Sequence, residues 1–247
     1  MPGHTPWTGS TDDKLYLQSG QFSATLKTSL AVGTVDAAPF GVAWDGTNTP
    51  WVGQQADKLY LQSGQFSATL KTSRAVSAVE NEPSGISWDG THTPACGSGD
   101  DKLYVFSGQF SATLKASLAV AAIETFPQDV SWDGANTPWT GSTDDKLYLQ
   151  SGQFSATLKT SLAVVTVDAA PSGISWDGTH TPVSGNTDNK LYLFSGQFSA
   201  TLKTSLAVGT IDTGPTGIEN TTRLAVASVV ITKPLLLNTA VRRAATW

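Results

Sequence analysis

The chain has 247 residues, of which 39% are hydrophobic and 14% are charged, and its formal net charge is −5. This length and composition suit one large globular domain and exclude an intrinsically disordered chain. The charge is unevenly distributed: residues 1–219 contain 20 acidic and 11 basic residues, whereas residues 220–247 contain four basic residues and no acidic one. The acidic body argues against a nucleic-acid partner, because such a partner is held through its phosphates by basic groups.

Local sequence argues against three further features: an intramolecular disulfide, a secretory signal and a membrane-spanning segment. The single cysteine, Cys96, rules out an intramolecular disulfide. The first residues lack the charged region and the apolar stretch of a secretory signal, so no signal peptide is predicted. The localisation of the protein stays open. The apolar stretch 224–237 is interrupted by Lys233 and Pro234 and is too short to span a bilayer.

A unit of 44 residues repeats along the chain. The nine-residue sequence SGQFSATLK begins at Ser19 and recurs unchanged in four later units. Lysines spaced by 44 residues mark the same register: Lys14, Lys58, Lys102, Lys146 and Lys190. A fixed period of this length is the signature of a repeat architecture, so the fold is to be derived from one unit.

Each unit predicts four short strands, which we take in chain order from Thr137. The strands expected are 137–142, then 145–151 with alternating apolar residues, then a longer one at 154–164 with clean period-two alternation. A proline-containing loop at 168–171 leads to 173–178, whose Asp-Gly end supplies turn chemistry. This strand is the first of the next unit, so 137–142, 145–151 and 154–164 are the second, third and fourth strands.

Four strands in about 44 residues resemble a blade of the β-propeller superfold, and the resemblance covers residues 3–219. It implies an all-β, five-bladed β-propeller with four antiparallel strands per blade. The unit lacks the Gly-His and Trp-Asp dipeptides of WD-type blades at their usual places, so no specific family is assigned. An open β-solenoid is the alternative, but it would leave both end faces exposed.

The ends of the repeat predict how the ring closes. The chain begins at Thr5-Pro6-Trp7, in the second strand of a unit, and residues 216–218 supply one extra first strand. We expect that strand to pair with the N-terminal blade, which removes the two open edges.

Residues 220–247 depart from the repeat and form a second region, a basic and partly apolar tail. Two interpretations stay open. The tail attaches the propeller to a larger assembly, or it is an out-of-frame remnant of a further unit.

No catalytic residue, metal ligand or cofactor site is predicted. The histidines His4, His92 and His180 share a column with Asn48 and Asn136, and a ligand or base does not tolerate that exchange, so they are expected to be turn residues. Identical blades also place identical groups in a ring, whereas an active site brings together different groups. We see no strongly departing blade and expect the protein not to be an enzyme.

The tryptophans fall into two columns. The constant column (Trp44, Trp88, Trp132, Trp176) is expected in the core between blades. The second column varies: Trp7, Trp51, Ala95, Trp139 and Val183. Because a packed position seldom exchanges Trp for Ala cheaply, we expect this second column to be exposed, and the column Gln18, Gln62, Phe106, Gln150 and Phe194 likewise.

Exposed Trp is a common platform for stacking a sugar or a partner's side chain. The candidate ligand-binding residues are therefore Trp7, Trp51 and Trp139, with the turn aspartates Asp13, Asp57, Asp101 and Asp145. Simpler structural explanations stay open: the tryptophans are incidental surface residues, and the aspartates belong to solvated turns.

These features favour a non-enzymatic, multivalent binding or assembly module, because weak contacts from identical blades sum on a repetitive protein or glycan surface. The near-identity of the units, which indicates recent duplication, is similar in style to repeat proteins of phages and environmental viruses. This resemblance implies that the protein lies on a virion surface. A soluble lectin with repeated sugar sites is the alternative.

Overall fold

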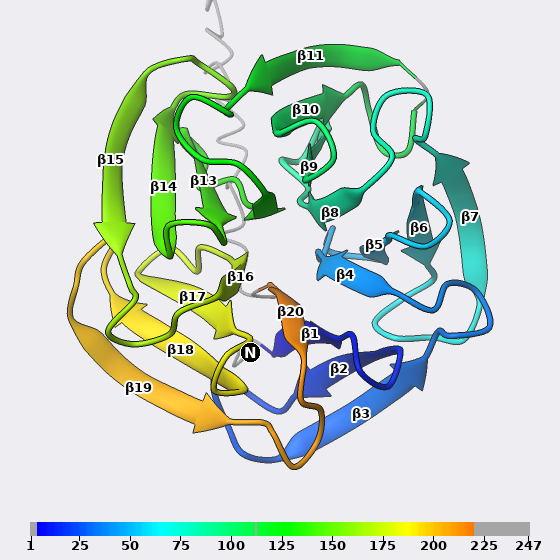
Figure 1. The fold of residues 1–247 in the computed structure, drawn as a ribbon. Helices are drawn as coiled ribbons and strands as arrows, with labels where there is room; N and C mark the ends of the chain where they lie inside the picture. The colour runs from blue at the N-terminus through cyan, green and yellow to red at the C-terminus, as the bar shows by residue number, and fades with distance from the viewer. Residues whose placement is uncertain (1–3, 112, 220–247) are drawn as a thin grey trace, which may run out of the picture.

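The computed structural model describes residues 4–111 and 113–219. These residues form five four-stranded antiparallel sheets arranged as blades around a central axis (Figure 1). The predicted five-bladed β-propeller is thus confirmed. The predicted tail, residues 220–247, lies outside the described residues.

Each blade runs from an inner strand near the axis to an outer strand at the rim. Blade 1 is β20-β1-β2-β3, and blades 2 to 5 are β4–β7, β8–β11, β12–β15 and β16–β19. The bounds are β1 Thr5–Gly9, β2 Lys14–Gln18, β3 Leu26–Ala31, β4 Pro39–Val42, β5 Thr49–Gly53, β6 Lys58–Gln62, β7 Leu70–Ala75, β8 Pro83–Ile86, β9 Thr93–Gly97, β10 Lys102–Phe106, β11 Leu114–Ala119, β12 Pro127–Val130, β13 Asn136–Gly141, β14 Lys146–Ser151, β15 Leu158–Ala163, β16 Pro171–Ile174, β17 His180–Gly185, β18 Lys190–Ser195, β19 Leu202–Ala207 and β20 Pro215–Ile218.

The ring closes as the sequence predicts. Strand β20, from the end of the repeat, pairs antiparallel with β1, so that Trp7 lies opposite Ile218. The backbone N–H of Glu219 donates to the carbonyl of Pro6 at 2.9 Å, and that of Ser10 donates to Gly214 at 2.9 Å. Blade 1 therefore combines the two ends of the repeat region and has four strands, as the other blades do.

The core consists of five apolar clusters, each shared by two neighbouring blades. In one of them, Leu15 and Leu17 of blade 1 pack with Val42, Trp51 and Tyr60 of blade 2. Strand residues alternate between the two faces of a blade, so each blade contributes one face to the cluster before it and one to the cluster after it.

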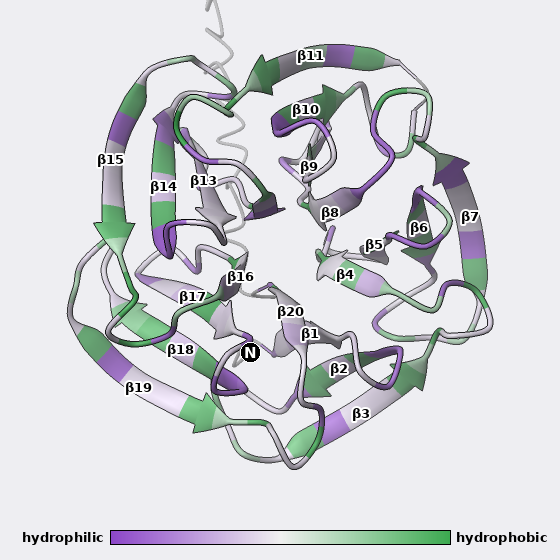
Figure 2. Ribbon diagram, in the orientation of Figure 1, coloured by the Kyte–Doolittle hydropathy of each residue, from purple (hydrophilic) through white to green (hydrophobic). Residues whose placement is uncertain are grey.

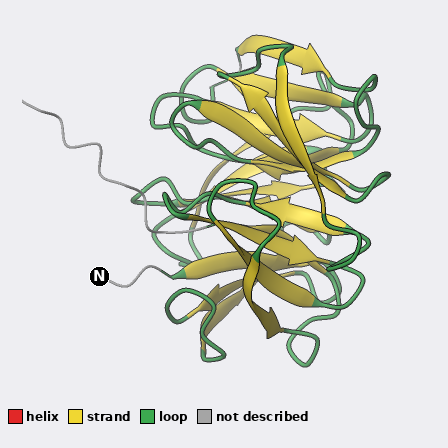
Figure 3. Cartoon of the chain, turned by 90° about the vertical axis from the view of Figure 1, so that its left-hand side faces the viewer, coloured by secondary structure: helices red, strands yellow, loops and turns green. Residues whose placement is uncertain are grey.

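The loops divide into two sets at opposite ends of the ring, seen from the side in Figure 3. We call the face with the β4–β5 and β6–β7 loops and their equivalents the latch face. The face with the β5–β6 and β7–β8 loops and their equivalents we call the acidic face.

The fourth strand of each unit is shorter than the alternation predicts. Strand β15 begins at Leu158 instead of Phe154. Phe154 has a φ of 60°, in the left-handed region, and its ring packs into the core. The N–H of Thr157 then donates to the Ser155 hydroxyl at 3.3 Å, which makes a side-chain turn. The period-two pattern therefore continues through a loop.

Candidate functional site

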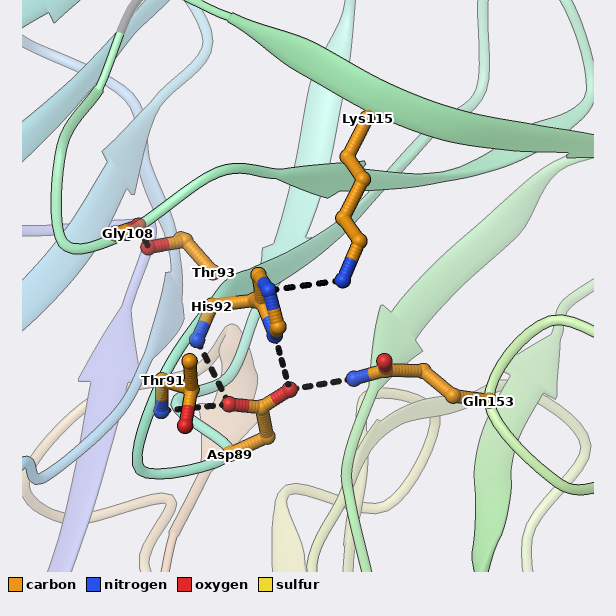
Figure 4. Close-up of polar contacts among 7 residues, drawn as sticks. All are labelled: Asp89, Thr91, His92, Thr93, Gly108, Lys115 and Gln153. Atoms are coloured by element: carbon orange, nitrogen blue, oxygen red, sulfur yellow. Dashed lines mark hydrogen bonds and ion pairs between the residues drawn. The ribbon is translucent and has the colours of Figure 1, made fainter.

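A polar node on the latch face joins neighbouring blades (Figure 4). Asp89, in the β8–β9 turn, accepts the backbone N–H groups of Thr91 and His92, each at 2.6 Å. Its other oxygen accepts a hydrogen bond from Nδ1 of His92 at 3.1 Å, and Nε2 of that ring accepts one from Lys115 at 2.7 Å. These bonds lower the pKa of Asp89 against the opposing effect of burial, which is the largest single influence on it.

Both ring nitrogens of His92 are engaged, so the ring is neither a free base nor a metal ligand in this arrangement. In blade 4, Asn136 replaces the histidine: its amide N–H donates to Asp133 at 3.0 Å, and its Oδ1 accepts from Lys159 at 3.5 Å. The amide thus reproduces the donor and acceptor of the imidazole. The His-to-Asn exchange preserves a structural turn, as the sequence predicts.

The same aspartate column fastens neighbouring blades at four of the five interfaces. The Nε2 of Gln153, in the β14–β15 loop, donates to Asp89 of the preceding blade. We call this contact the latch. Equivalent latches join four interfaces: Gln109 to Asp45, Gln153 to Asp89, Gln197 to Asp133, and Gln21 to Asp177. The glutamine of the repeated SGQF sequence therefore has a structural role.

On the acidic face, a buried carboxylate organises each blade. Glu124 accepts the backbone N–H groups of Thr143 and Asp144 at 3.1 and 3.0 Å. Asp144 in turn accepts from Lys146 and Tyr148, both at 2.5 Å. Burial and the neighbouring Asp144 raise the pKa of Glu124, because two close carboxyl groups resist ionising together. The described residues hold no cluster of three or more His, Cys, Asp or Glu suited to a metal ion.

The four predicted aspartates lie in the β–β turns of the acidic face. Asp13, Asp57, Asp101 and Asp145 all adopt a positive φ between 50° and 56°. Asp and Asn tolerate this left-handed conformation better than most residues, and Asn189 takes the same place in blade 5. The backbone carbonyl of Asp13 accepts the N–H of Val32 at 2.9 Å. Their geometry thus explains the residue type without a ligand.

The predicted exposure of Trp7, Trp51 and Trp139 is wrong, since all three side chains are fully buried. Each stacks on the tyrosine opposite it on the next strand, and Trp139 and Tyr148 have ring centroids 4.3 Å apart. The Gln/Phe column, also expected at the surface, is buried as well. These tryptophans therefore lie in the core between neighbouring blades, where no ligand can reach them.

The constant tryptophan column is the more accessible one. Trp44, Trp88, Trp132 and Trp176 are half-buried and follow the inner strands on the latch face, and they are absent from the five core clusters. The prediction that this column forms the inter-blade core is therefore wrong too.

Blade 4 differs from the other blades at the axis, a difference that the sequence analysis did not predict. The inner strands meet closely at the axis, where a Cβ added to Gly41 would lie 2.8 Å from Cα of Gly85. In blade 4 this glycine column holds Asp129, which accepts the N–H groups of Ile174 at 3.0 Å and Val130 at 2.9 Å. Burial raises its pKa well above the usual range, and the nearby Glu219 adds to the rise. The substitution of Asp for Gly in this column was the available signal.

The only cysteine lies in β9, within a core cluster between blades 3 and 4. Cys96 is buried, its Sγ lies 3.3 Å from the hydroxyl of Ser84, and burial raises its pKa well above the usual range. A thiol that stays protonated and inaccessible is not a nucleophile.

No protein family matches the sequence, and no curated protein matches it. Similarity to solved structures shows the propeller fold. A chain in the crystal structure of a nidogen–laminin complex has 12% identity and a TM-score of 0.57 over 87% of this chain and 83% of that one. A glutaminyl cyclase from Myxococcus xanthus has 13% identity and a TM-score of 0.52, over 74% and 77%. A virginiamycin B lyase from Staphylococcus aureus has 12% identity and a TM-score of 0.50, over 87% and 73%.

Proposed function

We propose that this chain is a non-enzymatic, multivalent binding module for a protein partner. The observation that carries the proposal is a surface repeated on all five blades. The outer strands expose nearly the same residues in every unit: 25–29, 69–73, 113–117, 157–161 and 201–205. We call these segments the rim bands. All their residues are exposed, and only Ala116 departs from the sequence Thr-Leu-Lys-Thr-Ser.

The polar groups support a binding role over a catalytic one. The histidine rings at 92 and 180 hold Asp and Lys partners, the latch carboxylates hold turns and glutamines, and the thiol is buried. The fold itself is shared with a lyase and a cyclase and with a chain of a protein–protein complex. The choice between enzyme and binding module therefore rests on the residues of this chain.

Five equivalent sites act together when the partner is itself repetitive, as a virion surface or another particle is. Attachment to a virion, suggested by the style of the sequence, stays a prediction.

No helix that could span a membrane occurs in the part of the chain that the structure describes.

A measurement of avidity, through the rate of dissociation from surfaces of different coverage, tests this function. The full chain is screened on a protein array, and each protein that binds is then coupled to a sensor surface at sparse and dense coverage. The proposal predicts dissociation that slows as coverage rises, about 100-fold or more when several blades engage. Dissociation that is independent of coverage for every captured protein would exclude a multivalent module.

A glycan-binding function is a second candidate, favoured by the half-buried tryptophans of the latch face. Trp44, Trp88, Trp132 and Trp176 are half-buried and stand at the same position in four blades, and tryptophan rings commonly stack on sugars. A glycan array probed with the full chain and with Trp88→Ala tests it. A signal lost in the variant supports this function, and a blank array with the folded full chain rejects it.

A further inference from the structure

The outermost strand of each blade has one backbone edge that no described strand covers. Strands β3, β7, β11, β15 and β19 each pair with a single neighbour, at the end of their sheets. Figure 2 shows a hydrophilic position next to a hydrophobic one along these strands at the rim. An uncovered edge of six residues is a template onto which another extended segment can pair.

The rim bands have diverged less than the loop that follows the outer strand in each unit. Four of the five band columns are identical in all units, and the fifth changes once, at Ala116. By contrast, the column that begins at Gly33, which is exposed in four of the five units, reads Gly, Ser, Ala, Val and Gly along the chain. Both segments face solvent, so packing does not account for the difference.

One exposed apolar residue accompanies each band. The leucines Leu26, Leu70, Leu114, Leu158 and Leu202 have 38–41% of their surface exposed. They supply a repeated apolar contact beside the edge, which suits alternate side chains of an added strand.

The charge of the rim indicates which kind of segment could pair with the uncovered edge. From Ser19 to Val32, and in every equivalent segment, each unit carries lysine and no acidic residue. The tail, with four basic and no acidic residues, would bring like charge against the rim, and so would the rim of a second copy. An acidic segment of another protein meets opposite charge instead.

The lysine is held in place before any partner arrives. Lys115 Nζ lies 2.7 Å from Nε2 of His92, and Lys203 Nζ lies 2.7 Å from Nε2 of His180. A side chain that is already ordered loses less conformational entropy when it pairs with a carboxylate.

From these observations, and resting on the proposed binding function, we propose that each rim band binds an extended acidic segment of a protein partner, which adds to the blade as a further strand. Backbone hydrogen bonds to the outer strand supply the affinity. The lysine and leucine columns are consecutive along the outer strand, so they supply a preference for acidic side chains on one face of the added strand and apolar side chains on the other.

The test is a selection of random peptides of about ten residues, the upper length of an ordinary strand, against the immobilised full chain. The recovered pool is expected to be enriched in Asp and Glu and poor in Pro. A recovered peptide remade with Pro at alternate positions is expected to lose binding at least about tenfold, because Pro donates no backbone hydrogen bond.

Two sets of substitutions locate the site with the same change of charge. The rim set is Lys27, Lys71, Lys115, Lys159 and Lys203, each changed to Gln, which keeps a donor for the His or Asn partner. The control set is Lys14, Lys58, Lys102, Lys146 and Lys190, each changed to Gln. We expect peptide affinity to fall about tenfold or more in the rim set and to stay within about twofold in the control set.

Several results would overturn the inference. They are a selection that yields no peptide above the bare support, a pool without acidic enrichment, binding that survives proline, or equal losses in the two lysine sets. A dimer of the full chain in sedimentation that the rim set abolishes would make a second copy the occupant. Peptides that bind with avidity yet ignore the rim set would reject the rim and leave the multivalent module standing.

Discussion

Trp139 and Gln150 lie on the same face of the β13–β14 hairpin, two positions apart in register, and both side chains are fully buried. In blade 3 the two places hold Ala95 and Phe106, whose ring lies 6.3 Å from that of Tyr104. Every unit with Trp in the first place has Gln in the second, and every unit without it has Phe. The two columns therefore share one packing volume beside the conserved tyrosine.

This exchange predicts strong coupling in a double-mutant cycle. Trp139→Ala alone is expected to cost about 3–5 kcal/mol of unfolding free energy, because it leaves a cavity. Gln150→Phe alone is expected to cost about 1–3 kcal/mol through overpacking. The double variant reproduces blade 3, so it is expected to be more stable than the sum of the two costs by at least about 1 kcal/mol. Urea unfolding measures all three, and simple additivity would contradict the shared volume.

The latch predicts a ranking of substitutions at Gln153. Replacement by Ala removes one hydrogen bond to a carboxylate and is expected to cost about 1 kcal/mol. Replacement by Glu sets a second carboxylate against Asp89 and is expected to cost more. Thermal unfolding of both variants, with Gln109→Ala as an equivalent at another interface, provides the measurement. A glutamate variant as stable as the alanine variant would show that the latch does not bear on stability.

The node at His92 predicts that the amide is an adequate replacement for the imidazole. His92→Asn keeps a donor to Asp89 and an acceptor for Lys115, so its unfolding free energy at pH 8 is expected to stay within about 0.5 kcal/mol of the parent. His92→Leu removes both and is expected to cost about 1–2 kcal/mol. Equal losses in the two variants would mean that ring packing, and not the hydrogen bonds, fixes this column.

The acidic face predicts a pH dependence that differs between blades. Burial, and then the hydrogen bond with Asp100, raise the pKa of Glu80 to about 7 from an ordinary 4.5. A carboxyl group with a higher pKa in the folded protein binds its proton more tightly there, so the free energy of unfolding falls as the pH rises from about 4.5 to 7. Asp100→Asn is expected to flatten this fall, because Glu80 then ionises without a neighbouring charge.

Urea unfolding between pH 5 and 8 measures that slope, and Glu82→Gln in the same loop is the control that should leave it unchanged. Blade 2 already carries Ala56 where the other blades have Asp100 and its equivalents. A steeper fall in Asp100→Asn than in the parent would contradict the assignment of the raised pKa to the carboxyl pair.

The architecture was predictable because it follows from periods. The 44-residue repeat gives the blades, the alternation within each unit gives the strands, and the extra strand at 216–218 supplies the partner of β1 that closes the ring. These features survive small errors in strand boundaries. The start of β15 was missed because Phe154 keeps the alternation while its backbone turns into the left-handed region.

The candidate site was less predictable, because each column was judged alone. The exchange of Trp for Ala indicates exposure only if nothing else fills the volume, and Phe106 and Phe194 fill it. Read together, the two columns indicate a shared core. Asp129 was visible as an acid in a glycine column, but only the closeness of the inner strands shows that its carboxyl group is enclosed at the axis.

The most direct test of the account is the number of peptides that one chain binds. Isothermal titration of the full chain with the best acidic peptide from the selection gives this number. The account predicts equivalent sites approaching one for each of the five blades, and a titration that disappears in the rim set. A single site per chain, or binding that persists in the rim set, would contradict a repeated rim that binds extended acidic segments.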